Sequence, residues 1–187
     1  MKYPNGINKQ YINVKSHSNR GMNLEADIND TNNYYLENNI AIIHKKPTPI
    51  TINKVDYKSR CDAVIKEAHF RIPSTTDYNG IYKGKYIDFE AKETKSSTSF
   101  PLNNIHKHQI EHLKQIYNHG GIGFIIVKFT KLNKTYLLFI EDLIYFINNN
   151  ERASIPICFF EDKAHIIKEG LIPRIDYIKI IESKVIL

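Results

Sequence analysis

The stretch from Asp77 to Thr94 reads DYNGIYKGKYIDFEAKET and predicts a β-hairpin. Gly84 lies in the turn sequence Tyr82-Lys-Gly-Lys85, where glycine readily accepts the positive φ that tight turns need. Along the second arm apolar and polar residues alternate, as in a strand whose two faces meet different surroundings. The apolar face carries Ile87, Phe89 and Ala91, and the polar face carries Asp88, Glu90 and Lys92.

Three side chains of this hairpin indicate metal-dependent hydrolysis. Asp77 opens the first arm, so a short hairpin can bring its carboxylate to the same end of the sheet as Glu90. Two close carboxylates repel unless a cation lies between them, and hard oxygen ligands select Mg²⁺, which substrate phosphate can complete. Lys92 shares the face of Glu90 and can stabilise charge that develops on a phosphoryl group. An ordinary solvated strand face is the alternative interpretation.

A helix is expected at about 104–118, ended by Gly120 and Gly121. Its inward stripe contains Ile105 and Leu113, and Gln109 falls in the middle of that stripe. A buried amide costs stability unless it is hydrogen-bonded or bound to a ligand. Gln109 therefore either caps a backbone group or reaches the metal cluster, and we prefer the second hypothesis.

Composition favours one globular domain that binds a polyanion. The chain has 187 residues, of which 42% are hydrophobic, and a formal net charge of +6. Cys61 and Cys158 form no CxxC pair, so a zinc ribbon or redox motif is excluded. The first residues have no apolar core typical of a signal peptide, and no run of about 18 apolar residues is present. We expect a soluble cytoplasmic protein that does not enter membranes.

The remaining pattern predicts an α/β fold. Residues 1–20 are expected to form a flexible basic arm, which is either a disordered tail or a contact to DNA. Residues 21–38 predict an amphipathic helix that carries Glu25 on its flank, and 40–45 predict a strand. A nearly all-apolar strand at 123–127 has its expected antiparallel neighbour at 136–140, and weaker helical or strand patterns follow at 141–149 and 161–169. Helices and strands in this order on one sheet are typical of an α/β or α+β sandwich, and we expect a single domain spanning 21–187.

Residues 45–73 stand apart as a basic excursion from the main sheet. The segment contains a short helical pattern at 63–68 and ends at Pro73. A solvated connector is the alternative to a DNA-contacting insert. The basic residues that we assign to DNA contact, in the arm and in this insert, are Arg20, Lys45, Lys46, Lys54, Lys58 and Arg60.

Several motifs lie in order along almost the entire chain. Asp77 followed by Glu90-Ala-Lys92 is a pattern that is weak by itself. Its surroundings are more specific: Ser18-Asn-Arg-Gly-Met22, His44-Lys-Lys-Pro-Thr-Pro49, Ser74-Thr-Thr-Asp77, Ser99-Phe-Pro-Leu102, His108-Gln-Ile-Glu-His112 and Pro173-Arg-Ile-Asp-Tyr177. Together these motifs resemble those of the RecU-type Holliday junction resolvases, which carry a PD-(D/E)xK nuclease signature. Thr76 occupies the place of the superfamily's proline, as is usual in this family.

The resemblance implies a restriction-endonuclease-like α/β fold, in which a mixed β-sheet is flanked by helices and a stalk protrudes. It also implies a homodimer that acts on four-way DNA junctions. The stalk corresponds to the insert at about 45–73. The implied metal site consists of Thr75, Asp77, Glu90 and Gln109, with Mg²⁺ as the cofactor and Mn²⁺ as an expected substitute. Lys92 matches the catalytic lysine, and Glu25 matches a helix-borne glutamate that can orient a water or a second cation. Contacts with recombinase or branch-migration proteins stay open.

Three other functions compete with this one. The chain could be a PD-(D/E)xK nuclease that acts on other DNA, or a non-catalytic protein that binds junctions. His108-Gln-Ile-Glu-His112 also has the HxxEH spacing of inverted zinc peptidases, in which two histidines one turn apart share a metal. Short motifs of this kind are weak evidence without their structural context.

Overall fold

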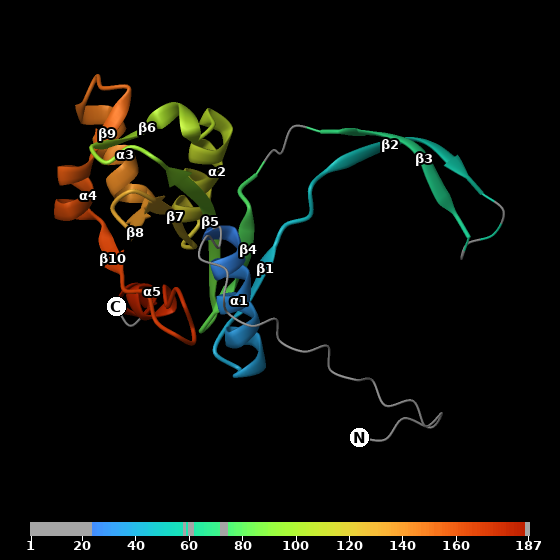
Figure 1. Ribbon diagram of the computed structural model, residues 1–187, viewed down its shortest axis with the longest axis horizontal. Helices are drawn as coiled ribbons and strands as arrows, with labels where there is room; N and C mark the ends of the chain where they lie inside the picture. Colours follow the sequence, from blue (N-terminus) through green and yellow to red (C-terminus); the bar gives the residue numbers. More distant parts are fainter. Residues whose placement is uncertain (1–23, 58, 60–61, 72–74, 186–187) are drawn as a thin grey trace.

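The computed structural model describes residues 24–57, 59, 62–71 and 75–185. One six-stranded mixed sheet has the order β1-β4-β5-β7-β8-β10, in which β5 and β7 are parallel and all other neighbours are antiparallel. Helices lie on both faces of this sheet, and a separate two-stranded hairpin projects from it (Figure 1). The predicted fold class is therefore confirmed.

The elements follow one another along the chain in this order: α1 (Leu24–Glu37), β1 (Ile42–Lys45), β2 (Ile50–Asp56), β3 (Val64–Phe70), β4 (Tyr78–Tyr82), β5 (Lys85–Thr94), β6 (Ser99–Pro101), a 3₁₀ turn (Leu102–Asn104), α2 (Lys107–Asn118), β7 (Ile122–Phe129), β8 (Lys134–Phe139), α3 (Ile140–Asn149), β9 (Ser154–Pro156), α4 (Ile157–Lys163), β10 (His165–Ile167) and α5 (Ile178–Val185). The segment 161–169 is thus divided between α4 and β10. Among the described helices, none is both long and apolar enough to cross a membrane.

The sheet separates two hydrophobic cores, and β7 contributes to both because successive side chains of a strand point to opposite faces. Phe124 and Ile126 join Ile28 of α1 in the first core. Ile125 and Val127 join Leu113 of α2 in the second, together with residues of α3 and α4. Covering both faces explains why every residue of β7 is buried.

The hairpin of β4 and β5 forms as predicted. Its turn at Lys83 and Gly84 has positive φ angles of 46° and 79°, and β4 pairs with β5 through register partners such as Tyr78 and Phe89. The rings of these two residues stack with centroids 4.8 Å apart inside the first core. This packing turns the other face of β5, with Asp88, Glu90 and Lys92, away from α1.

The predicted excursion is the hairpin of β2 and β3, which pair only with each other among the described strands. Every residue of both strands is exposed. The helical pattern expected at 63–68 is wrong, because Val64–Phe70 is a strand. Backbone pairing with β2 determines its conformation, and an insert exposed on both faces has no buried side to show a strand's alternation.

Candidate active site

Asp77 and Glu90 meet where β4 begins beside the middle of β5. Asp77 directly precedes β4, and the register of Tyr78 with Phe89 places it opposite Glu90. The backbone N–H of Asp77 donates a hydrogen bond of 3.0 Å to Oε2 of Glu90. The two carboxylates that the sequence singled out are therefore held on paired strands.

Lys92 completes this group from the same face of β5. Its Nζ lies 2.5 Å from Oε1 of Glu90, whose side chain has no exposed surface. Burial raises the pKa of Glu90 to about 7, the Lys92 ammonium opposes this rise, and the negative charge of Asp77 adds to it. Near neutral pH, Glu90 can therefore exchange a proton for a cation.

A helix-borne carboxylate reaches the same place. Leu24 and Ile28 anchor α1 in the first core, and the backbone N–H of Leu24 donates a 2.6 Å hydrogen bond to Glu93 on β5. These contacts bring Glu25 to a cavity of about 260 Å³ that we call the carboxylate cavity. It is lined by Leu24, Glu25, Asp77, Tyr78, Ala91, Lys92 and Glu93.

A second cavity, of about 330 Å³, adjoins the first at the base of the projecting hairpin, and we call it the hairpin-base cavity. Glu25 and Asp77 border both cavities. The other residues that line it are Lys45, Lys46, Pro47, Thr48, Pro49, Thr75 and Thr76. Thr75 thus lies beside Asp77, on the side from which the hairpin projects.

The donor set of this site fits Mg²⁺. No three His, Cys, Asp or Glu side chains within the described ranges come together as a complete metal-binding group. Mg²⁺ needs no such group, since it is usually held by one or two carboxylates, several waters and substrate phosphate. Asp77 and Glu90 would supply those carboxylates, with the adjoining cavities open to the remaining ligands.

Gln109 caps its own helix in the structure. Its Oε1 accepts a 3.0 Å hydrogen bond from the backbone N–H of His106, the N-cap of α2. Because α2 begins at Lys107, Gln109 is its third residue, where a glutamine side chain can cap the helix by reaching back. Of the two interpretations of this buried amide, the structure shows the capping hydrogen bond, and a contact between Gln109 and a metal stays a prediction.

The histidines of the HxxEH motif do not converge on a metal. The ring of His108 stacks on His106 with centroids 5.3 Å apart, whereas Nε2 of His112 lies 3.3 Å from Oδ2 of Asp88. The two rings are engaged with different partners. The structure therefore gives the zinc peptidase hypothesis no support.

The basic residues assigned to DNA contact have different surroundings. Lys45 pairs with Glu25, Lys46 pairs with Asp88 at 2.8 Å, and Lys54 is exposed on β2. Arg20, Lys58 and Arg60 lie outside the described residues. Apart from the polar face of β5, no pattern in the sequence indicated the pair of Lys46 and Asp88.

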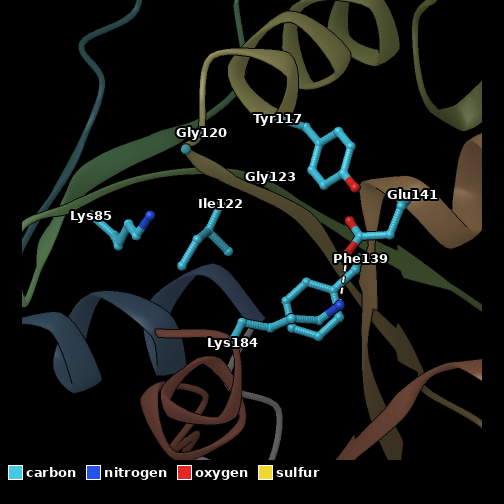
Figure 2. A pocket seen from close by; sticks show the side chains of 9 residues that line it. Lys85, Tyr117, Gly120, Ile122, Gly123, Phe139, Glu141 and Lys184 are labelled. Carbon is cyan, nitrogen blue, oxygen red and sulfur yellow. Dashed lines mark hydrogen bonds and ion pairs between the residues drawn. The ribbon is translucent and has the colours of Figure 1, made fainter. Parts of the chain in front are cut away.

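A smaller cavity of about 170 Å³ lies elsewhere, where β5 and β7 begin (Figure 2). Lys184 spans it, with Nζ 2.7 Å from Glu141 and over the ring of Phe139. Glu141 offsets the charge of Lys184, and Lys85 adds a second ammonium to the lining. Lys85, on its rim, lies about 16 Å along β5 from Glu90.

We expect cation binding to weaken as the pH falls through 7. The stability of the metal-free protein should instead decrease as the pH rises. The pKa of Glu90 is raised above its ordinary 4.5 to about 7, so ionisation at higher pH destabilises the fold, by up to about 3 kcal/mol. Glu90→Gln should therefore raise the free energy of unfolding in EDTA most at pH 8, with the gain shrinking towards pH 4.5. Urea denaturation across this pH range measures the gain in the free energy of unfolding. A gain that does not depend on pH would contradict the raised pKa of Glu90.

Comparison with known proteins shows the family to which the chain belongs. Residues 19–183 match the family described as RecU: Recombination protein U. Proteins named Holliday junction resolvase RecU from Bacillus mycoides and Bacillus cytotoxicus are 53% and 52% identical, over 98% and 97% of this chain and 97% and 96% of theirs. A solved structure of the Holliday junction resolvase Hjc from Archaeoglobus fulgidus aligns with a TM-score of 0.41 at 10% identity, over 73% of this chain and 93% of that one. The chain belongs to the RecU family.

Proposed function

We propose that this protein is a Mg²⁺-dependent endonuclease that resolves four-way DNA junctions. The observation that carries the proposal is the group of Asp77, Glu90 and Lys92 on two paired strands. The name Holliday junction resolvase borne by its relatives supports the substrate. Action on DNA also implies the cytoplasmic location that we expect.

Each residue of the group has a distinct task in hydrolysis. Asp77 and Glu90 would hold the cation, which when bound supplies Lewis-acid chemistry, and Mn²⁺ would substitute for Mg²⁺. Lys92 would stabilise the charge that develops on the phosphoryl oxygens. Glu25, at the edge of both cavities, would orient the attacking water or a second cation. Thr75 lies beside Asp77 as a further oxygen donor.

The DNA backbone would run through the hairpin-base cavity. Lys45 and Thr75 line it next to Asp77, and the exposed hairpin that carries Lys54 projects from its rim. Lysine contacts to phosphates would make binding depend on salt. Arg20, Lys58 and Arg60 remain predicted contributors to the same contact, and recombinase or branch-migration proteins remain predicted partners.

Cleavage assays test the function directly. Wild type and Glu90→Ala are incubated with a four-way junction, linear duplex and single-stranded DNA, with Mg²⁺ or with EDTA. We expect paired nicks on the junction alone, abolished by EDTA and by Glu90→Ala, with junction binding retained. Cleavage by Glu90→Ala would contradict the site. Equal cleavage of linear duplex would indicate a nuclease for other DNA, and an inactive wild type would indicate a non-catalytic binder.

Resolution of a four-way junction needs two cuts, and the described residues of one chain hold one group of Asp77, Glu90 and Lys92. We therefore propose a homodimer whose two sites cut symmetrically. An exposed apolar row crosses three neighbouring strands and provides a surface for the second copy. Ile42 pairs with Ile81, and Ile81 pairs with Tyr86, and these side chains are 49%, 47% and 39% exposed. Contiguous apolar surface of this kind often marks an interface.

Ile81→Asp should yield a monomer, because a dimer would bury the new carboxylate against apolar side chains. Size-exclusion chromatography with light scattering measures the mass. Leu171→Asp, which alters a residue that is 95% exposed, is the matched control. An Ile81→Asp protein that remains dimeric would place the interface elsewhere.

A further inference from the structure

Asp88 is a buried carboxylate to which the proposed reaction assigns no task. It lies on β5, two residues before Glu90, and has no exposed surface. Four side chains from four parts of the chain surround it. Lys46 and the Tyr86 hydroxyl donate to Oδ2 at 2.8 and 2.9 Å, Nε2 of His112 lies 3.3 Å from Oδ2, and the Thr76 hydroxyl donates to Oδ1.

Two of these partners also hold the backbone that leads into Asp77. Nζ of Lys46 donates to the Thr76 hydroxyl at 2.9 Å, and the backbone N–H of Lys46 donates to the carbonyl of Asp77 at 2.7 Å. The N–H of Asp77 donates to Glu90. Thr76 and Asp77 precede β4 and lie outside its paired residues. These hydrogen bonds therefore hold their backbone in place, as strand pairing holds the backbone of the sheet.

Charge makes this arrangement costly to disturb. Lys46 has a side chain that is 19% exposed and pairs with a carboxylate that is wholly buried. Removing one partner would leave the other as a buried charge without its counterpart. Thr76 bridges the two charged groups, since its hydroxyl accepts from Lys46 and donates to Asp88. The three side chains thus form one connected unit.

We propose that Lys46, Thr76 and Asp88 act as a clamp that fixes Asp77 against Glu90 in the geometry needed to bind a divalent cation. They are positioning residues and act through Asp77. The clamp rests on the proposed function for its purpose, although its effect on Asp77 can be measured without DNA or metal. It also gives Lys46 a task different from the DNA contact that we first assigned to it.

Two substitutions at Thr76 distinguish the effect of its hydroxyl from the effect of the shape of its side chain. Thr76→Val keeps the volume and loses the hydroxyl, whereas Thr76→Ser keeps the hydroxyl. Tyr86→Phe is the matched control, because it removes a different hydrogen bond to the same carboxylate. The first readout is hydrogen exchange of the Asp77 amide in EDTA. It should become about tenfold faster in Thr76→Val and stay near the wild-type rate in Thr76→Ser and Tyr86→Phe.

The second readout is calorimetric titration with Mn²⁺ in the absence of DNA. Partners behind a metal ligand typically contribute 10-fold to 100-fold to affinity, so the dissociation constant should rise at least tenfold in Thr76→Val and less than threefold in Thr76→Ser. In junction cleavage, kcat should fall in Thr76→Val while KM for the junction changes little. Should Thr76→Val fail to fold, Asp88→Asn replaces it in both measurements, with the same expected losses.

The outcomes separate the clamp from the function. A folded Thr76→Val protein with wild-type exchange at Asp77 overturns the clamp, as does one that exchanges faster yet binds Mn²⁺ as tightly as wild type. A wild type that binds no Mn²⁺ contradicts the proposed metal site. The faster exchange at Asp77 in Thr76→Val would then still support the clamp.

Discussion

Replacing Lys92 with methionine should slow junction nicking by about 10²-fold to 10³-fold, the usual effect of removing one group that stabilises transition-state charge. Methionine keeps much of the unbranched stem and removes the ammonium that lies 2.5 Å from Glu90. A second consequence follows from the same contact. Because Lys92 holds the pKa of Glu90 down against burial, its loss should move that pKa higher and weaken cation binding at neutral pH.

These two effects can be separated by pH and metal concentration. Raising the pH to 9 and the Mn²⁺ concentration should restore cation binding in Lys92→Met but leave most of the loss in kcat. Lys95→Met alters an exposed lysine just beyond β5 and should nick at the wild-type rate. A Lys92→Met protein that nicks within threefold of wild type would remove Lys92 from the mechanism. Binding of the junction, measured in Ca²⁺, should be unchanged.

The largest effect on stability is expected from Gly80→Ala. A Cβ at Gly80 would lie 2.1 Å from the carbonyl oxygen of Ile42 and 2.6 Å from Cα of Ile43. Both are backbone atoms of β1, so β1 would have to move away from β4, and we expect a loss of about 3 kcal/mol or more in the free energy of unfolding. Urea denaturation measures this loss.

Gly84→Ala provides the contrast. No atom lies within 4 Å of a Cβ at Gly84, but its φ is +79°. The expected loss is about 1 kcal/mol, from the backbone conformation alone. Similar losses at the two positions would show that β1 does not pack on Gly80 as described. Because Lys45 ends β1 and Lys46 follows it, displacement of this strand should also weaken the hydrogen bond from Lys46 to the carbonyl of Asp77.

The sequence was sufficient where one element carried its own pattern. The alternation along β5 and the all-apolar run of β7 each depend on local side chains, and both strands formed as predicted. Asp77 and Glu90 could be brought together because one short hairpin connects them. The insert was located by charge, but its second strand was mistaken for a helix because it has no buried face.

The other features of the site depend on the residue at which a helix begins, or on contacts between residues that are far apart in the chain. The capping hydrogen bond of Gln109 was not the interpretation that we preferred, because the helix was expected from about 104, whereas it begins at Lys107 and has Gln109 as its third residue. Asp88 looked like one more polar residue on a strand. Its partners Lys46 and His112 lie 42 and 24 positions away in the chain, so only the folded structure could reveal its burial and its role.

The projecting hairpin should open locally more often than the main sheet does. β2 and β3 bury none of their residues and pair only with each other among the described strands, and an isolated two-stranded hairpin is marginally stable in water. We expect its amide protons to exchange through frequent local openings, while those of β7 exchange only when the whole protein unfolds. Changes of length or sequence in the hairpin should therefore leave the melting temperature of the sheet almost unaltered. This part of the chain can change without disturbing the packing that holds Asp77, Glu90 and Lys92 together.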